Sequence, residues 1–230
     1  MAQKKILVIG GLGCTARPII DLLMNDYAIT IYDIASCRRD DVCDMRPLRN
    51  AMAGIDIVIH LAVNIADTTN DELSFQVNVF GTFNVLEAAR QMNVKKIIMA
   101  SSAPVHTDTA ARSPGEDFTY DLTKSLQELE AYHFSKTYAM HIMVLRLGHI
   151  VNGKKKADLN GVPLSKVAYC KGGWVCQYDV ARAFKKAAEL NFEGFHLLHI
   201  IGSYQAEDRF GLSAVKNILD FKCLERFTAY

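Results

Sequence analysis

The opening of the chain constrains the fold more than any other stretch. An apolar run at residues 6–9 leads directly into the segment GGLGCTA (residues 10–16), and a helical pattern follows. In this order, the unpaired N–H groups and the positive dipole end of the helix lie beside the glycine turn. Gly10 permits the tight turn, Gly13 lets a pyrophosphate approach the backbone, and Ala16 is small enough for the helix to pack on the strand. The pattern predicts a dinucleotide-binding turn.

A second strand pattern ends in an acid that could bind a ribose. Residues 28–33 (AITIYD) place Asp33 about 20 residues after the turn, where a carboxylate can accept hydrogen bonds from both hydroxyls of an adenosine ribose. We predict NAD because this carboxylate would repel a 2′-phosphate, while the nearby Arg38 and Arg39 leave NADP as the alternative. A turn that only joins a strand to a helix is the other interpretation. The predicted cofactor-binding residues of this region are Gly10, Gly13, Cys14, Thr15, Ala16, Asp33 and Ile34.

Short apolar runs alternate with helical patterns along the chain. This alternation is typical of α/β proteins in which a parallel sheet carries helices on both faces. We predict strands at 5–10, 28–33, 55–61, 96–101, 141–147 and 196–200, and helices at 15–25, 47–53, 71–92, 120–137, 178–190 and 212–219. The stretches 103–119 and 151–171 show neither pattern, and we expect loops there that flank a site.

Tyr120, Lys124 and Ser102 carry the predicted chemistry. Tyr120 and Lys124 are four residues apart on a predicted helix, so they share one face, and an ammonium beside a phenol favours the phenolate. Such a tyrosine can take a proton from a hydroxyl, for which a phenol with an ordinary pKa of about 10 is a poor base. Ser102 follows a strand at the edge where open α/β sheets bind ligands. The alternative is a surface helix pair.

Composition and cysteine usage exclude several classes of protein. The 26 basic and 25 acidic residues among 230 leave no electrostatic footprint for nucleic acid or a membrane surface. No apolar segment approaches the roughly 18 to 20 residues of a membrane span, and the chain enters a strand too early for a signal peptide. The six cysteines show no Cys-x-x-Cys and no His pair at zinc spacing, so we predict reduced thiols, no metal and a cytoplasmic protein.

From the turn to about Gly202, the chain resembles the extended short-chain dehydrogenase/reductases of the NAD-dependent epimerase/dehydratase family. The similar segments are Asp41-Val42 (adenine contact), HLAV at 60–63, NVFGT at 78–82, the serine segment ASSAPVH at 100–106, YDLTK at 120–124 and VLRLG at 144–148. The resemblance implies one Rossmann-type doubly wound domain over residues 1–230, with small substrate-cap segments around 148–178 and 201–230. It adds the cofactor-binding residues Asp41, Val42, Leu61, Ala62, Val63, Asn78, Tyr120, Lys124 and Leu147, and the substrate residues Asn64, Ala103, His106 and His149. It also implies a structural role for Asp179.

The resemblance implies an NAD-dependent oxidoreductase or epimerase that acts on a hydroxyl of a sugar-like small molecule. The layout is similar to that of the small uronate dehydrogenase-like members, but Ala103-Pro104 does not match their carboxylate-binding segment. The segment between Asp33 and Asp41 is short, so we expect an abbreviated third strand. One alternative is a nucleotide-sugar epimerase or dehydratase whose diphosphate is held by Lys154–Lys156. A non-catalytic dinucleotide-binding regulator is the other.

Two long helical patterns predict a homodimer. Residues 71–92 and 120–137 carry apolar side chains on several faces, and such a helix must bury them against something. In the family that the chain resembles, these two helices form a four-helix dimer interface, which implies a twofold homodimer. The alternative is that the side chains fill a monomer core. The residues concerned are Leu73, Val77, Phe80, Phe83 and Val85, and Leu126, Leu129, Tyr132 and Phe134.

Overall fold

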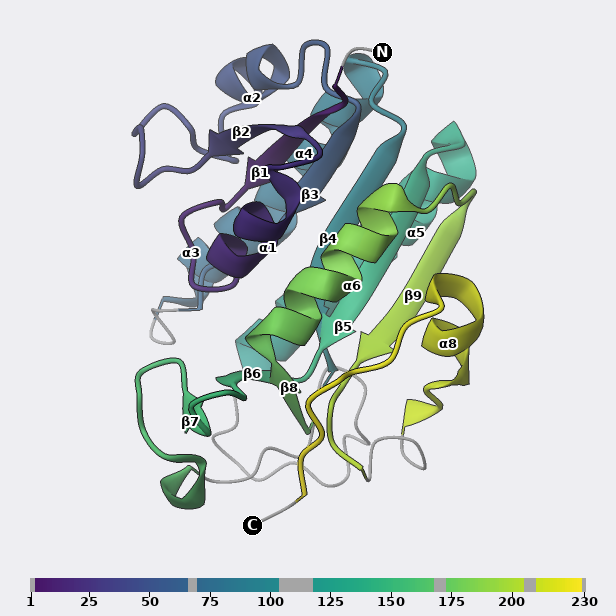
Figure 1. Cartoon of the computed structure of the whole chain (residues 1–230). Coiled ribbons are helices and arrows are strands. Elements are labelled where there is room, and N and C mark those ends of the chain that lie inside the picture. Colours follow the sequence, from purple (N-terminus) through teal and green to yellow (C-terminus); the bar gives the residue numbers. More distant parts are fainter. Residues whose placement is uncertain (1–2, 66–69, 104–117, 168–172, 205–209, 229–230) are drawn as a thin grey trace.

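A parallel sheet forms the centre of the computed structural model, which describes residues 3–65, 70–103, 118–167, 173–204 and 210–228 (Figure 1). Its six strands lie in the order β2-β1-β3-β4-β5-β9, and every neighbouring pair is parallel. The strands are β1 (Lys5–Ile9), β2 (Ala28–Tyr32), β3 (Ile57–His60), β4 (Lys96–Ser102), β5 (His141–Leu147) and β9 (Phe195–Ile200). The predicted Rossmann-type sheet is confirmed, with each predicted strand found within two residues of its expected bounds.

Helices cover both faces of this sheet (Figure 1). One face carries α1 (Ala16–Leu23) and α6 (Gln177–Glu189), with α8 (Ser213–Leu219) beside β9, and the other carries α2 (Met45–Ala51), α4 (Gly81–Gln91) and α5 (Phe118–Tyr138). Residues 6–9 of β1 are fully buried because their side chains alternate between the two apolar cores. In the part of the chain that is described, no helix is long and apolar enough to cross a membrane.

The predicted helix at 71–92 is not one α-helix. It begins with α3 (Asp71–Ser74), whose cap Asn70 accepts a hydrogen bond from the Leu73 N–H at 3.0 Å, and continues through a π-helical stretch, η1 (Phe75–Phe80), into α4. π-Helical turns inside α-helices occur frequently at functional sites. Here the wider turn contains the buried Asn78, which contacts two other segments of the chain.

Residues 33–44 form turns and no strand, so the expected abbreviated third strand is absent. A further parallel strand beside β2 would need its own crossover connection, and the segment before α2 is too short for one. Strand β2 therefore forms the edge of the sheet.

The expectation of a loop at 151–171 is wrong in part, because short strands and a 3-10 turn interrupt its described residues 151–167. The strands β6 (His149–Asn152), β7 (Ala157–Asp158) and β8 (Trp174–Cys176) form a small sheet in the order β7-β6-β8. The 3-10 turn η4 (Leu164–Lys166) lies between β7 and β8 in the sequence. Strands this short give no readable alternation in the sequence. They pack around the buried Trp174 together with Phe227. The other expected loop, 103–119, lies mostly outside the described residues.

The C-terminal segment is hydrogen-bonded to the start of α6 and to the residues that follow β9. Asp179 at the start of α6 accepts hydrogen bonds from the N–H groups of Leu224 and Glu225, both at 3.0 Å, and pairs with Arg182. Phe227 donates its N–H to the Gly202 carbonyl at 2.9 Å. The Asp179 carboxylate thus has the structural role expected of it, and it holds residues 221–228 against the small sheet.

Candidate active site

The glycine turn follows β1 at the carboxyl end of the sheet. Gly10 has φ +77°, and a Cβ there would lie 2.5 Å from the Ala62 backbone nitrogen. Gly13 is exposed, and a Cβ there would meet only the Gly10 carbonyl oxygen at 3.4 Å, so its outer side is open. Ala16 is fully buried where α1 meets the sheet, while Cys14 is exposed. The turn is closed underneath and open above, which fits a pyrophosphate laid along its backbone.

Asp33 lies directly beside this turn. Its Oδ2 accepts a hydrogen bond from the Leu12 N–H and its Oδ1 one from the Ala35 N–H, both at 2.9 Å. The neighbouring Ile34 is exposed. Across the segment, Val42 packs on Gly81, and its carbonyl accepts a hydrogen bond from Asn84 at 3.0 Å, which fixes the predicted adenine side. The carboxylate is therefore held at the glycine turn by two backbone N–H groups.

Asn78 holds together the loop after β3 and the start of α5. Its Oδ1 accepts from the Asn64 N–H at 2.7 Å, and its Nδ2 donates to the Asn64 carbonyl and to Thr123 at 3.2 and 3.0 Å. The Asn64 amide donates to Ser74. These bonds occupy both groups of the buried Asn78 amide, so the side chain joins the loop at Asn64 to α5.

His60, at the end of β3, is a buried neutral group. Its Nε2 lies 2.9 Å from the Thr82 hydroxyl, which also accepts a hydrogen bond from Gln127 at 2.5 Å. Burial, and then the charge of Lys124, lower the pKa of His60 to about 3. The imidazole therefore adds no positive charge to this region near neutral pH.

Tyr120 and Lys124 are brought together on α5 as predicted. The Lys124 ammonium lies 5.9 Å from the centre of the Tyr120 ring and donates a hydrogen bond to the Ala100 carbonyl of β4 at 3.1 Å. Only 4% of Lys124 is exposed, and burial lowers its pKa to about 8 against the opposing charge of Glu128. Ser102 ends β4, two residues beyond the carbonyl that holds Lys124. Lys124 thus lies beside Tyr120 and is hydrogen-bonded to the strand that ends in Ser102.

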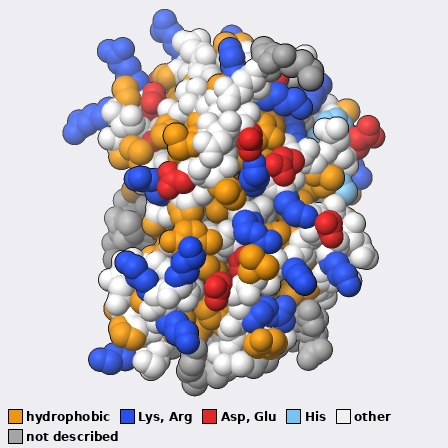
Figure 2. All heavy atoms as spheres, in the orientation of Figure 1, with side chains coloured by type: hydrophobic (Ala, Val, Ile, Leu, Met, Phe, Trp, Pro, Cys, Tyr) orange, Lys and Arg blue, Asp and Glu red, His pale blue; other side chains and the backbone are white. Residues whose placement is uncertain are grey.

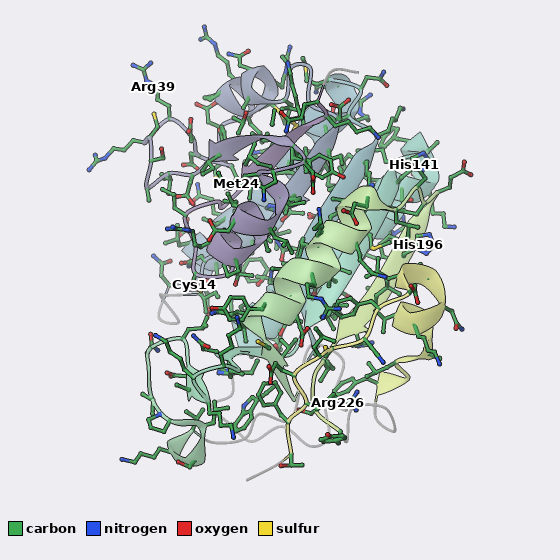
Figure 3. All side chains as sticks on the ribbon, viewed as in Figure 1. Cys14, Met24, Arg39, His141, His196 and Arg226 are labelled. Atoms are coloured by element: carbon green, nitrogen blue, oxygen red, sulfur yellow. The ribbon has the colours of Figure 1, made fainter. Side chains whose placement is uncertain are left out.

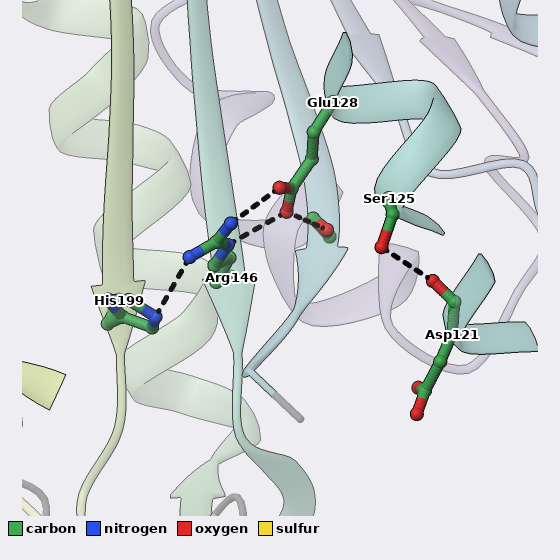
Figure 4. A network of polar contacts seen from close by, with 6 residues as sticks. Asp121, Ser125, Glu128, Arg146 and His199 are labelled. Atoms are coloured by element: carbon green, nitrogen blue, oxygen red, sulfur yellow. Dashed lines mark hydrogen bonds and ion pairs between the residues drawn. The ribbon is translucent and has the colours of Figure 1, made fainter. Parts of the chain in front are cut away.

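A buried ion pair that the sequence analysis did not select lies next to the junction of α5 and β4 (Figure 4). Glu128 binds Arg146 through two hydrogen bonds of 2.9 and 2.6 Å, and it accepts a third from Ser101 at 2.5 Å. Arg146 also lies 3.5 Å from His199 on β9. The one signal in the sequence is the position of Glu128 four residues after Lys124, which places both on one helix face.

Three of the four predicted substrate residues, Asn64, Ala103 and His149, lie in the part of the chain that the structure describes. His149 is exposed at the start of β6, Ala103 is buried against Ile201, and His106 lies outside the described residues. Leu147 ends β5 in register with Ser102 and Ile200. In the lysine run, Lys154 lies over the Tyr178 ring at 4.5 Å.

A cavity of about 560 Å³ opens at the carboxyl end of β9. Strand β9 is one edge strand of the sheet, and the glycine turn follows β1, next to the other edge strand. Its lining combines apolar side chains from β9 and α8 with basic ones from the C-terminal part of the chain. The lining residues are His199, Ile200, Ile201, Gly211, Leu212, Ser213, Val215, Lys216, Phe221, Lys222, Cys223 and Arg226.

The surface and the remaining histidines offer no second catalytic cluster on the face shown. Figure 2 shows acidic and basic side chains interspersed with apolar ones over α1 and α6. In Figure 3, Cys14 and Arg226 lie toward the carboxyl ends of the strands, whereas His141 and His196 lie at the opposite end, where β5 and β9 begin. Among the described residues, no group of three His, Cys, Asp or Glu could hold a metal ion.

Comparisons with known proteins agree with the fold. The family model "NAD dependent epimerase/dehydratase family" matches residues 6–160. The chain is 25% identical over 213 residues to L-arabinose 1-dehydrogenase (NAD(P)(+)) of Haloferax volcanii, covering 81% of this chain and 83% of that protein. It is 29% identical over 154 residues to uronate dehydrogenase of Pseudomonas syringae pv. tomato, covering 60% and 56%. A short-chain dehydrogenase/reductase superfamily protein of Agrobacterium tumefaciens with bound NAD has the same fold, with TM-score 0.73, 16% identity and 95% and 92% coverage.

Proposed function

The chain belongs to the NAD-dependent epimerase/dehydratase family and is an NAD-dependent enzyme, and we propose that it oxidises or epimerises a hydroxyl of a sugar or sugar-like molecule. The observation that carries the proposal is the buried Lys124, which lies beside Tyr120 and is hydrogen-bonded to β4 two residues before Ser102. This junction of α5 and β4 and the glycine turn both lie at the carboxyl ends of the parallel strands, where open α/β sheets bind their ligands.

NAD, when bound, supplies the hydride acceptor. The glycine turn would hold its pyrophosphate and Asp33 its adenosine ribose, while Lys124 would donate to the nicotinamide ribose. Ile34, Asp41, Val42, Leu61, Ala62, Val63 and Leu147 would line the rest of the cofactor site. The fit rests on the open side of Gly13 and on the carboxylate already hydrogen-bonded to the turn.

Tyr120 would take the proton from the substrate hydroxyl, and Ser102 would orient that oxygen. The Lys124 ammonium stabilises the phenolate because an opposite charge nearby favours the charged form. Net oxidation leaves the reduced cofactor, whereas epimerisation returns the hydride to the other face of the same carbon. Related enzymes are named for L-arabinose, uronates and nucleotide sugars. Assays with these sugars distinguish net oxidation from epimerisation.

We propose that residues 148–178 and 201–230 form a substrate cap on a single Rossmann domain. Support comes from the small sheet, from the C-terminal segment bound through Asp179, and from the cavity beside β9. The register of Ser102, Leu147 and Ile200 puts the cavity wall two strands from the catalytic serine, about 10 Å away. We propose that His149 at the start of β6 contributes to this cap.

Tighter binding of NAD than of NADP is expected. The Asp33 carboxylate at the turn would repel the 2′-phosphate of NADP, which NAD lacks. Calorimetric titration of the same protein with both cofactors measures it. Asp33→Asn should reduce the preference by weakening NAD and relieving the repulsion of NADP, and tighter binding of NADP to the wild type would show that Arg38 and Arg39 determine the choice.

A twofold homodimer through α4 and α5 is expected at micromolar concentration. Val85 and Phe134 belong to the monomer core, but Phe83, Leu129 and Tyr132 remain exposed on these helices, as does Phe80 at the end of η1. Light scattering should give twice the chain mass. Leu129→Asp (52% exposed) should give monomers. The matched control Met24→Asp, at the C-cap of α1 (58% exposed), should leave the dimer intact. A monomeric wild type, with and without NAD, would contradict the dimer.

We also propose a cytoplasmic location, supported by the free thiols of Cys14, Cys37, Cys43, Cys176 and Cys223. Cell fractionation tests this location directly. Recovery of the protein with its cysteines oxidised outside the cytoplasm would contradict it.

A further inference from the structure

Glu128 stands in line with the two proposed catalytic groups of α5. Tyr120, Lys124 and Glu128 follow one another at intervals of four residues, so all three lie along one side of the helix. The Glu128 side chain is buried, and so is most of its partner Arg146. A buried ion pair is weak evidence for stability, because the cost of removing both charges from water can exceed their attraction. Its position one turn beyond Lys124 therefore needs another explanation.

The ion pair joins three elements of the site (Figure 4). Arg146 on β5 binds the Glu128 carboxylate from one side, and Ser101 on β4 donates to Oε1 at 2.5 Å from the other. Ser101 and Arg146 are paired in the sheet register, and Ser101 immediately precedes Ser102. One carboxylate thus fixes α5 to the two strands whose ends carry the proposed site.

The same carboxylate acts on the charge of Lys124. Burial lowers the pKa of Lys124, and Glu128 is the charged neighbour that raises it again. The other titratable or charged groups around this lysine are Tyr120 on α5, the neutral His60 on β3 and, on β5, Arg146, which is paired with Glu128. The π-helical stretch η1 contributes the uncharged Asn78.

We propose that Glu128 is a positioning residue: held by Arg146 and Ser101, its carboxylate keeps the buried Lys124 cationic and sets α5 against β4. This inference rests on the proposed function, because a cationic Lys124 is required to bind the nicotinamide ribose and to stabilise the Tyr120 phenolate. Without the carboxylate, the lysine would lose its proton at lower pH.

The test is the affinity for NAD as a function of pH, which requires no substrate. In the wild type, affinity should fall as Lys124 loses its proton above pH of about 8. In Glu128→Gln this fall should move to lower pH by about one unit, with affinity unchanged well below it. In Arg146→Gln, which breaks the same ion pair but removes a cation, the fall should not move to lower pH. A purely structural role would make both variants behave alike.

Two further variants keep the result interpretable. Glu87→Gln removes the same charge from the ion pair with Arg90 on α4 and should leave the pH dependence unchanged. If Glu128→Gln does not fold, the double variant Glu128→Gln/Arg146→Gln, which leaves no unpaired Arg146, should show a downward shift that is smaller because a cation is removed with the carboxylate. Coincident curves for the wild type and the folded Glu128 variant would overturn the role of Glu128 alone. A wild type that binds no NAD would overturn the proposed function and this inference with it.

Discussion

Tyr120→Phe is expected to reduce turnover roughly 10²–10⁴-fold while the affinity for NAD stays nearly unchanged. The substitution removes the hydroxyl that takes the substrate proton but keeps the ring beside Lys124. Steady-state kinetics together with cofactor titration measure both effects. Lys124→Met should reduce turnover and cofactor affinity together, because the same ammonium is proposed to act on the phenol and on the ribose.

The matched control is Tyr132→Phe, which makes the same change on the same helix at a half-exposed tyrosine three turns further along. It should retain the activity of the wild type. If Tyr120→Phe kept most of its activity on a confirmed substrate, Tyr120 would not be the base.

Gly10→Ala is expected to abolish cofactor binding and to destabilise the fold by about 3 kcal/mol or more. The new Cβ would lie 2.5 Å from the backbone nitrogen and 2.7 Å from the Cα of Ala62, and backbone cannot rotate away as a flexible side chain can. The loop after β3 would have to move, and with it the floor of the glycine turn.

Gly54→Ala separates this collision from backbone strain. Gly54 has φ +70°, close to the +77° of Gly10, but a Cβ there would meet nothing within 4 Å. Its cost should be that of a positive φ alone, about 1 kcal/mol, with NAD binding intact. Chemical denaturation of both variants gives the comparison, and equal losses of stability would contradict the role assigned to the Gly10–Ala62 contact.

The sequence was sufficient to predict the central sheet because its inner strands are buried on both faces. Residues 6–9 read as a continuous apolar run for that reason, and the helices between strands carry a clear period. The glycine turn, Asp33 and the pair of Tyr120 and Lys124 were equally readable, since each depends on short spacing within one or two elements.

Features that depend on contacts between distant segments could not be predicted from the sequence. The π-helical turn around Asn78 depends on its bonds to Asn64 and Thr123, and β6, β7 and β8 are too short to show a period. The ion pair of Glu128 and Arg146 joins a helix to a strand 18 residues later. No pattern in either segment indicates that these two residues pair.

Hydride transfer from a sugar hydroxyl tests the proposed function most directly. Wild-type protein and NAD, in equal amounts, would be mixed with L-arabinose, uronates and nucleotide sugars in turn, with reduced nicotinamide followed by absorbance and sugar configuration by NMR. At least one sugar should give reduced cofactor or an inverted centre with the wild type, and neither with Tyr120→Phe. A wild type that binds NAD firmly yet changes none of these sugars would contradict the proposed activity and favour a non-catalytic dinucleotide-binding protein.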